Sequence, residues 1–298
     1  MDSSRLLFAF GITLFAGLAT GIGGLIAFFA KRTKTTFLAF SLGFSAGVMI
    51  FISFTEILTG AGDIMRQNYD ANTAAWLTFI AFVAGIGLSA AIDKILPSEG
   101  NPHELKRVEQ MHPESRDPDK PECQGRKNQN RGGHDTGNQN RRGHSIRDRK
   151  LMRIGTFTAI AIGVHNFPEG IATFMSAMSD VTVGISIAVA VAIHNVPEGI
   201  AVSVPVYYAT GSRRKALAWS VLSGFSEPIG ALAGYFILTL FNTGISLGYV
   251  FAMVAGIMVY ISFDELLPAA HKYGKHHVAI YGLISGMIMI GISLILLG

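Results

Sequence analysis

The sequence predicts an all-α polytopic membrane protein with eight transmembrane helices. Three observations support this prediction: few charged residues, eight long apolar runs, and two internal repeats. Half of the 298 residues are hydrophobic, 15% are charged, and the mean hydropathy is +0.41. A soluble chain of this length carries about 75 charged residues, whereas this one carries 44. The composition excludes disorder over most of the chain and argues against a soluble globule.

Each apolar run has about 20 to 26 residues, which is enough for a helix to cross roughly 30 Å of hydrocarbon. The runs cover residues 6–30, 37–59, 74–96, 154–177, 183–208, 216–241, 246–267 and 278–297. The first run is too long for a signal peptide, and it follows an acidic residue and a single arginine. We therefore interpret it as a transmembrane span.

The charged residues divide the chain into three parts. Residues 98–150 contain 21 of the 44 charged residues, and we interpret this segment as a disordered cytoplasmic loop with four histidines. It repeats NQNRGGH as NQNRRGH and lacks the apolar content to fold alone. Residues 1–97 then contain spans one to three, and residues 151–298 contain spans four to eight with the functional site.

Basic residues predict the orientation of the spans. With alternating spans, 22 lysines and arginines fall on one side and 2 on the other, and the ratio is still 8 to 2 without the long loop and its flanks. Because basic loops stay in the cytoplasm, both termini are predicted to be extracytoplasmic. The protein is expected in the cell (inner) membrane as a multi-pass protein.

Two internal repeats indicate an inverted architecture. HNFPEGIA (165–172) recurs as HNVPEGIA (194–201), and AGVMIFISFTEIL (46–58) recurs as AGIMVYISFDELL (255–267). Under the predicted topology each motif occurs in opposite orientations, so spans 1–3 match spans 6–8, and span 4 matches span 5. Secondary transporters favour this architecture. It places Glu56 at the outer end of span two, and Asp264 and Glu265 at the inner end of span seven.

Seven polar residues fall within about four residues of the midpoints of spans four, five and six, which is within roughly 6 Å of the membrane centre. They are His165, Asn166, Glu169, His194, Asn195, Glu198 and Glu227. Three carboxylates at this depth are costly without a compensating cation. The central parts of these spans contain no lysine or arginine, so a bound divalent cation is the simplest explanation.

The spacing within the motif suits metal binding. His165 and Glu169 lie one helical turn apart and share a face, and Asn166 precedes the same glutamate by three residues. One carboxylate can thus bridge two ions, one beside the histidine and one beside the asparagine. Histidine with carboxylate suits Zn²⁺, Fe²⁺, Mn²⁺ or Cd²⁺, and asparagine with carboxylate suits a harder ion. The second copy repeats this arrangement.

The two HNxPEG motifs in consecutive helices, with SEP in the next, resemble the ZIP (Zrt-, Irt-like) family of divalent metal transporters. The resemblance covers the eight spans but not the 98–150 insert. It implies a binuclear site, with one position formed by His165, Glu169, His194 and Glu198. The other position would use Asn166, Glu169, Asn195, Glu198 and Glu227. It also implies uptake into the cytoplasm and an elevator-like motion of spans 1, 4, 5 and 6 against the others.

The expected function is import of Zn²⁺, and also of Fe²⁺, Mn²⁺, Cd²⁺ or Co²⁺, with metal as substrate, no cofactor and no enzymatic activity. Expected partners are divalent metal ions, the lipid bilayer and a second copy in a homodimer, and not nucleic acid. The main alternative is an intramembrane metal-dependent hydrolase, which needs an open metal position and a general base. A second alternative, a proton-coupled transporter of organic solutes, leaves the paired histidines unexplained.

Overall fold

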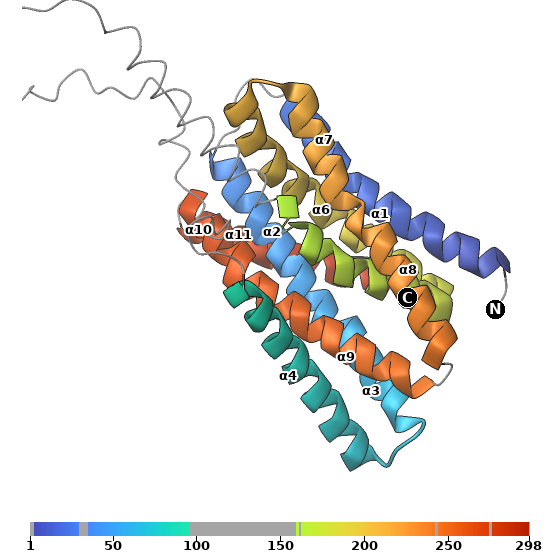
Figure 1. The fold of residues 1–298 in the computed structure, drawn as a ribbon. Coiled ribbons are helices and arrows are strands. Elements are labelled where there is room, and N and C mark those ends of the chain that lie inside the picture. The colour runs from blue at the N-terminus through green and yellow to red at the C-terminus, as the bar shows by residue number, and fades with distance from the viewer. Residues whose placement is uncertain are drawn as a thin grey trace, which may run out of the picture.

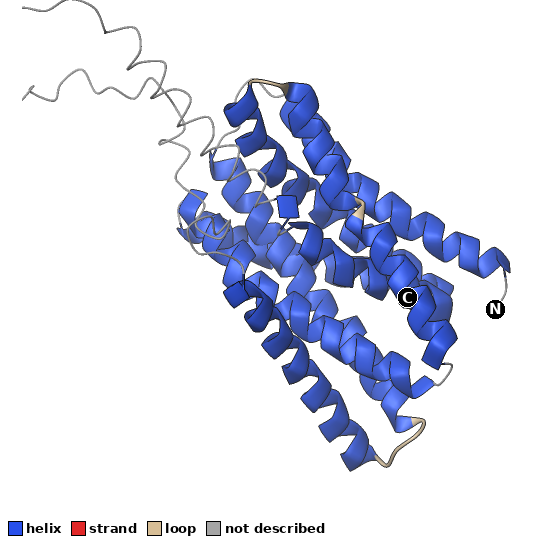
Figure 2. Ribbon diagram, viewed as in Figure 1, coloured by secondary structure: helices blue, strands red, loops and turns tan. Residues whose placement is uncertain are grey.

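The computed structural model describes residues 3–29, 35–95, 159–160, 162–241, 244–273 and 276–297. Within these ranges every regular element is a helix and no strand occurs (Figure 2). The predicted all-α fold is therefore confirmed. The predicted loop at 98–150 lies outside the described residues.

Figure 1 shows the helices packed into one bundle, with α1 and α4 at opposite edges. They are α1 (Ser3–Phe29), α2 (Thr35–Ile52), α3 (Leu58–Arg66), α4 (Ala71–Ile95), α6 (Val181–Thr210), α7 (Arg213–Gly224), α8 (Ser226–Phe241), α9 (Gly244–Ile261), α10 (Leu267–Tyr273) and α11 (His276–Leu297). The first HNxPEG motif lies in a helix over 162–179. Two π-helical turns, Ser53–Ile57 and Ser262–Leu266, join α2 to α3 and α9 to α10.

Seven helical segments are long and apolar enough to cross a membrane. They are Ser3–Ile26, Thr36–Arg66, Ala71–Lys94, Val181–Val204, Arg213–Leu240, Leu247–His271 and His276–Leu296. The fourth predicted span, 154–177, lies partly outside the described residues, and residues 162–179 are helical. These segments are those of a polytopic membrane protein.

Two spans extend further than the apolar runs predict. Glu56 and Glu265 do not end their helices, because the chain stays helical through α3 to Arg66 and through α10 to Tyr273. An apolar run ends where polar and charged residues become frequent, whereas a helix continues while its backbone hydrogen bonds are satisfied. Each acid lies within a π-helical turn at the same position of its repeat copy, and such turns are frequent at functional sites.

A single non-helical residue, Asp180, joins the 162–179 helix to α6. Asp180 Oδ1 accepts hydrogen bonds from the backbone N–H groups of Thr182 (2.8 Å) and Val183 (3.0 Å). This is a standard N-cap, which satisfies two of the free donors at the start of α6. The tight connection places the two HNxPEG motifs side by side on neighbouring helices.

The helices pack as two groups. In one group α1 packs on α6, α7 and α8, and α6 packs on α7; in the other α2 packs on α11 and α10, and α9 packs on α4 and α3. Among the helices named here, α2 against α6 joins the two groups. The motif in α6 therefore faces the boundary between the groups.

Each copy of the longer repeat packs on its neighbour through an equivalent glycine. Gly47 in α2 lies against the backbone carbonyl of Leu283 in α11, and Gly256 in α9 lies against that of Phe82 in α4. A Cβ at either glycine would overlap the carbonyl, so these backbones approach closely only without a side chain. The two copies thus build the same helix–helix contact.

Candidate metal centre

All seven predicted site residues are buried. His165 is 3% exposed and the other six are fully buried, at 0%. The 162–179 helix carries the first motif, α6 carries the second, and Glu227 lies in the first turn of α8, just after the break at Phe225. In the described part of the chain no lysine or arginine forms an ion pair with the three glutamates. Among the described residues, the cost of burying these acids is therefore not offset by a lysine or arginine.

Glu169, His194 and Glu198 form the centre of the site. One ligand atom from each lies within 4.8 Å of the others, which is close enough for one metal ion. His194 Nε2 lies 3.1 Å from Glu169 Oε1, and His194 Nδ1 lies 3.0 Å from the carbonyl oxygen of Ala190. A proton on Nδ1, donated to that carbonyl, directs Nε2 toward the carboxylates. Metal-binding histidines are commonly oriented by such a hydrogen bond.

The asparagines extend this centre on both sides. Asn195 Nδ2 donates to the carbonyl oxygen of Ala16 (2.9 Å) and to Glu227 Oε1. The Asn166 amide is oriented so that its nitrogen donates hydrogen bonds to the carbonyl oxygen of Ile162 (2.9 Å) and to Glu198 Oε2 (3.2 Å). Each asparagine therefore joins a glutamate to the backbone of a helix.

Four oxygen atoms of the centre have no hydrogen-bond partner among the described residues. They are Glu169 Oε2, Glu198 Oε1, Glu227 Oε2 and Asn195 Oδ1. Buried polar atoms are nearly always satisfied, and ionised carboxylate and amide oxygens are acceptors only. A cation satisfies such a set, and oxygen with imidazole nitrogen suits a borderline divalent ion.

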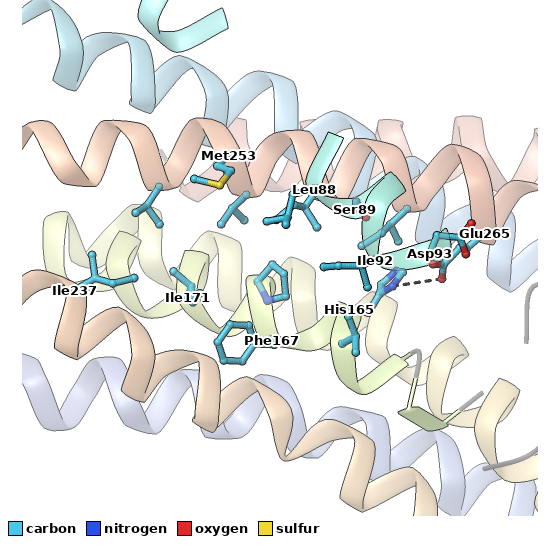
Figure 3. Close-up of a pocket in the computed structure, with 16 residues that line it drawn as sticks. Leu88, Ser89, Ile92, Asp93, His165, Phe167, Ile171, Ile237, Met253 and Glu265 are labelled. Carbon is cyan, nitrogen blue, oxygen red and sulfur yellow. Dashed lines mark ion pairs between the residues drawn. The ribbon is translucent and has the colours of Figure 1, made fainter. Parts of the chain in front are cut away.

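The structure does not bring His165 to this centre. Its Nδ1 lies 3.4 Å from Glu265 Oε2, in the second π-helical turn. Figure 3 shows this contact at the polar end of a cavity of about 300 Å³, near Asp93. The cavity is otherwise lined mainly by aliphatic side chains of α4, α9 and the 162–179 helix.

Sequence reasoning missed several groups at the centre. Ser45 in α2 donates to the carbonyl oxygen of His194 at 3.4 Å, and Thr20 Oγ1 lies 3.5 Å from the Asn166 amide. Both are small polar residues in apolar helices, and no spacing singles them out. Glu265 was named from the sequence as an acid at the inner end of span seven. Its contact with His165 could not be predicted, because the two residues are 100 positions apart in the chain.

The fold and the site define a multi-pass membrane protein with a buried centre of carboxylate, imidazole and amide groups. A family profile for ZIP zinc transporters matches residues 95–297. The chain is 51% identical over 294 residues to a zinc transporter ZupT of Streptococcus mutans, covering 99% of both chains. It is 50% identical over 296 residues to that of Clostridium perfringens (99% and 98% covered), and 51% identical over 300 residues to that of Nitratidesulfovibrio vulgaris (99% of both). The chain therefore belongs to the ZIP family, as the motifs predicted, and is a multi-pass protein of the cell membrane.

Proposed function

We propose that this protein imports Zn²⁺, and also Fe²⁺, Mn²⁺, Cd²⁺ or Co²⁺, across the cytoplasmic membrane by alternating access. The observation that carries the proposal is the buried group of Glu169, His194 and Glu198, whose ligand atoms lie within 4.8 Å of one another. Metal is the substrate and not a resident cofactor. Every acid of the centre serves as a metal ligand, so none is left to act as the general base that a metal-dependent hydrolase needs. The protein therefore transports metal and is not a hydrolase.

The centre holds two ions. The first position uses Glu169, His194 and Glu198, joined by His165 after its side chain turns away from Glu265. The second uses Asn166, Asn195 and Glu227 with the same two bridging glutamates. The unpartnered oxygens of the three glutamates and of Asn195 support this assignment, because each needs a cation or a donor.

The protein has eight spans in an inverted repeat, with both termini extracytoplasmic. The matching π-helical turns and the matching contacts of Gly47 and Gly256 support the repeat. Spans one, four, five and six move as a unit that carries the centre past the other four spans. The separate packing of α1, α6, α7 and α8 supports this division. In the bilayer the protein forms a homodimer, which the mass of the purified protein in detergent tests.

Uptake of ⁶⁵Zn²⁺ into proteoliposomes tests the proposal. The wild type accumulates zinc, whereas Glu169→Gln and Glu198→Gln abolish uptake while the protein elutes as a folded, monodisperse peak. Asp63→Asn is the matched control, because Asp63 is an exposed acid that pairs with Arg66 at 3.1 Å. Unchanged uptake by both glutamate variants would refute the proposed site, and no uptake by the wild type would refute the function.

A further inference from the structure

The helices α1 and α8 meet the two HNxPEG motifs through matching contacts. Gly23 in α1 lies against the carbonyl oxygen of Val196, and Gly230 in α8 lies against that of Phe167. Val196 and Phe167 are both the third residue of their motif. The two glycines therefore occupy equivalent places, one on each helix.

The glycines of the two motifs also make matching contacts, in this case with carbonyl oxygens of α1 and α8. The motif glycine Gly199 lies against the carbonyl oxygen of Thr20, and the motif glycine Gly170 lies against that of Glu227. The residue three positions before each glycine of α1 and α8 thus contacts the same motif as that glycine. These contacts make Thr20 the counterpart of Glu227.

Two further glycines lie at the centre of this arrangement. Gly17 in α1 and Gly224 at the end of α7 face each other, and a Cβ on either would overlap the carbonyl oxygen of the other. They are 207 positions apart, as are Thr20 and Glu227. A local two-fold axis therefore passes between Gly17 and Gly224 and relates the two sides of the centre.

The backbone contacts are the same on the two sides of this axis, but the side chains at the equivalent positions differ. On the α8 side Asn195 donates to the Glu227 carboxylate, whereas on the α1 side the Asn166 amide faces the Thr20 hydroxyl at 3.5 Å. Thr20 is fully buried, at 0% exposure. With the Asn166 nitrogen directed to Glu198, its oxygen lies on the Thr20 side, where the hydroxyl can donate to it.

We propose that Thr20 is a positioning residue of the metal centre: it occupies the ligand position equivalent to Glu227, and its hydroxyl orients the Asn166 amide on the α1 side, where the α8 side has a carboxylate. The proposal rests on the metal transport proposed above. Two divalent ions carry four positive charges against the three glutamates, so one positive charge is left uncompensated. A fourth carboxylate at position 20 would neutralise the centre and hold both ions more tightly, since charges attract strongly at low dielectric.

Moving the carboxylate across the axis tests this equivalence. Glu227→Thr should remove one of the two bound ions, measured by equilibrium dialysis with Zn²⁺ and Mn²⁺ on the full-length protein in detergent. Adding Thr20→Glu should restore the second ion. The matched control adds Thr13→Glu instead, because Thr13 is also fully buried in α1 but donates to the Ala9 carbonyl of its own helix at 2.8 Å.

Two single variants keep the inference falsifiable if the double variant fails to fold. Thr20→Val removes the hydroxyl and should weaken binding of the second ion by roughly 2- to 10-fold, the effect of one hydrogen bond. Thr20→Ser keeps the hydroxyl and should bind like the wild type.

The outcomes separate this inference from the function itself. A wild type that binds no metal would overturn the proposed transport. A wild type that binds two ions, with a folded Thr20→Glu/Glu227→Thr variant no better than Glu227→Thr, would overturn the role of Thr20. If that variant does not fold, equal binding by Thr20→Val and the wild type would overturn it.

Discussion

Two glycines in α4 give a direct test of how tightly the helices pack. Gly85 lies against the backbone of Met253 in α9, where a Cβ would overlap the carbonyl oxygen, while Gly87, two residues later, has nothing within 4 Å. The same substitution to alanine should therefore have opposite effects. A backbone carbonyl cannot rotate away, so Gly85→Ala must push α4 from α9.

The expected magnitudes follow from this geometry. Overpacking a well-packed contact costs about 1–3 kcal/mol, so Gly85→Ala should lower stability by that amount. Gly87→Ala should be neutral or stabilising by up to about 1 kcal/mol, because alanine favours helix more than glycine. At roughly 2–4 °C per kcal/mol, the melting midpoints of the two variants should differ by several degrees.

The assay is thermal unfolding in detergent, followed by the loss of the monodisperse peak in size-exclusion chromatography after heating. Zinc uptake is measured in parallel for the variants that remain folded. Equal midpoints for Gly85→Ala and Gly87→Ala would refute the close approach of α4 and α9. A fall in the midpoint of Gly87→Ala alone would do so as well.

Three further predictions concern ligands and pH. Zn²⁺ at about 100 times its dissociation constant should stabilise the folded protein by roughly 2.7 kcal/mol, and Glu198→Gln should lose this shift in melting midpoint; an equal shift in both proteins would contradict the site. Glu265→Ala should tighten Zn²⁺ binding by roughly 2- to 10-fold, because no side-chain acceptor at position 265 then competes for His165; unchanged binding in equilibrium dialysis would argue against His165 as a ligand. Hydrogen bonds from Thr73 lower the pKa of the Asp70 carboxyl from its usual 3.8. Asp70 caps the start of α4, because its Oδ1 accepts hydrogen bonds from the backbone N–H groups of Asn72 (3.2 Å) and Thr73 (3.1 Å). The stabilisation from this cap is complete above pH 3.8 and is lost as the pH falls through the lowered pKa. The melting midpoints of Asp70→Ala and the wild type should therefore differ at pH 7 and converge in acid; a difference independent of pH would contradict the cap.

Local spacing was sufficient to predict the core of the candidate site. Glu198 follows His194 by four residues, so a helix places both on one face, and the repeated motif indicated that Glu169 lies opposite them. The structure brings these three together. The break at Phe225 was harder to predict. Pro228, three residues later, has no N–H to donate, but Pro168 and Pro197 lack one too and their helices continue without a break.

The remaining features depend on tertiary packing, which leaves no periodic signal in the sequence. The contact of His165 with Glu265 joins two helices that meet only in the fold. Thr20 is a single threonine in an apolar helix, and its role follows from which carbonyl it presents to Gly199. A π-helical turn adds one residue to a helix, and the apolar pattern around Glu56 does not distinguish it from an α-helical turn.

The one-residue connection at Asp180 has a consequence for how the two motifs move. Only one residue separates the 162–179 helix from α6, and Gly184 lies against Ala177 beside the turn. The two helices therefore have little slack at this end of the pair. We expect them to shift together, so that a displacement of one motif displaces the other as well.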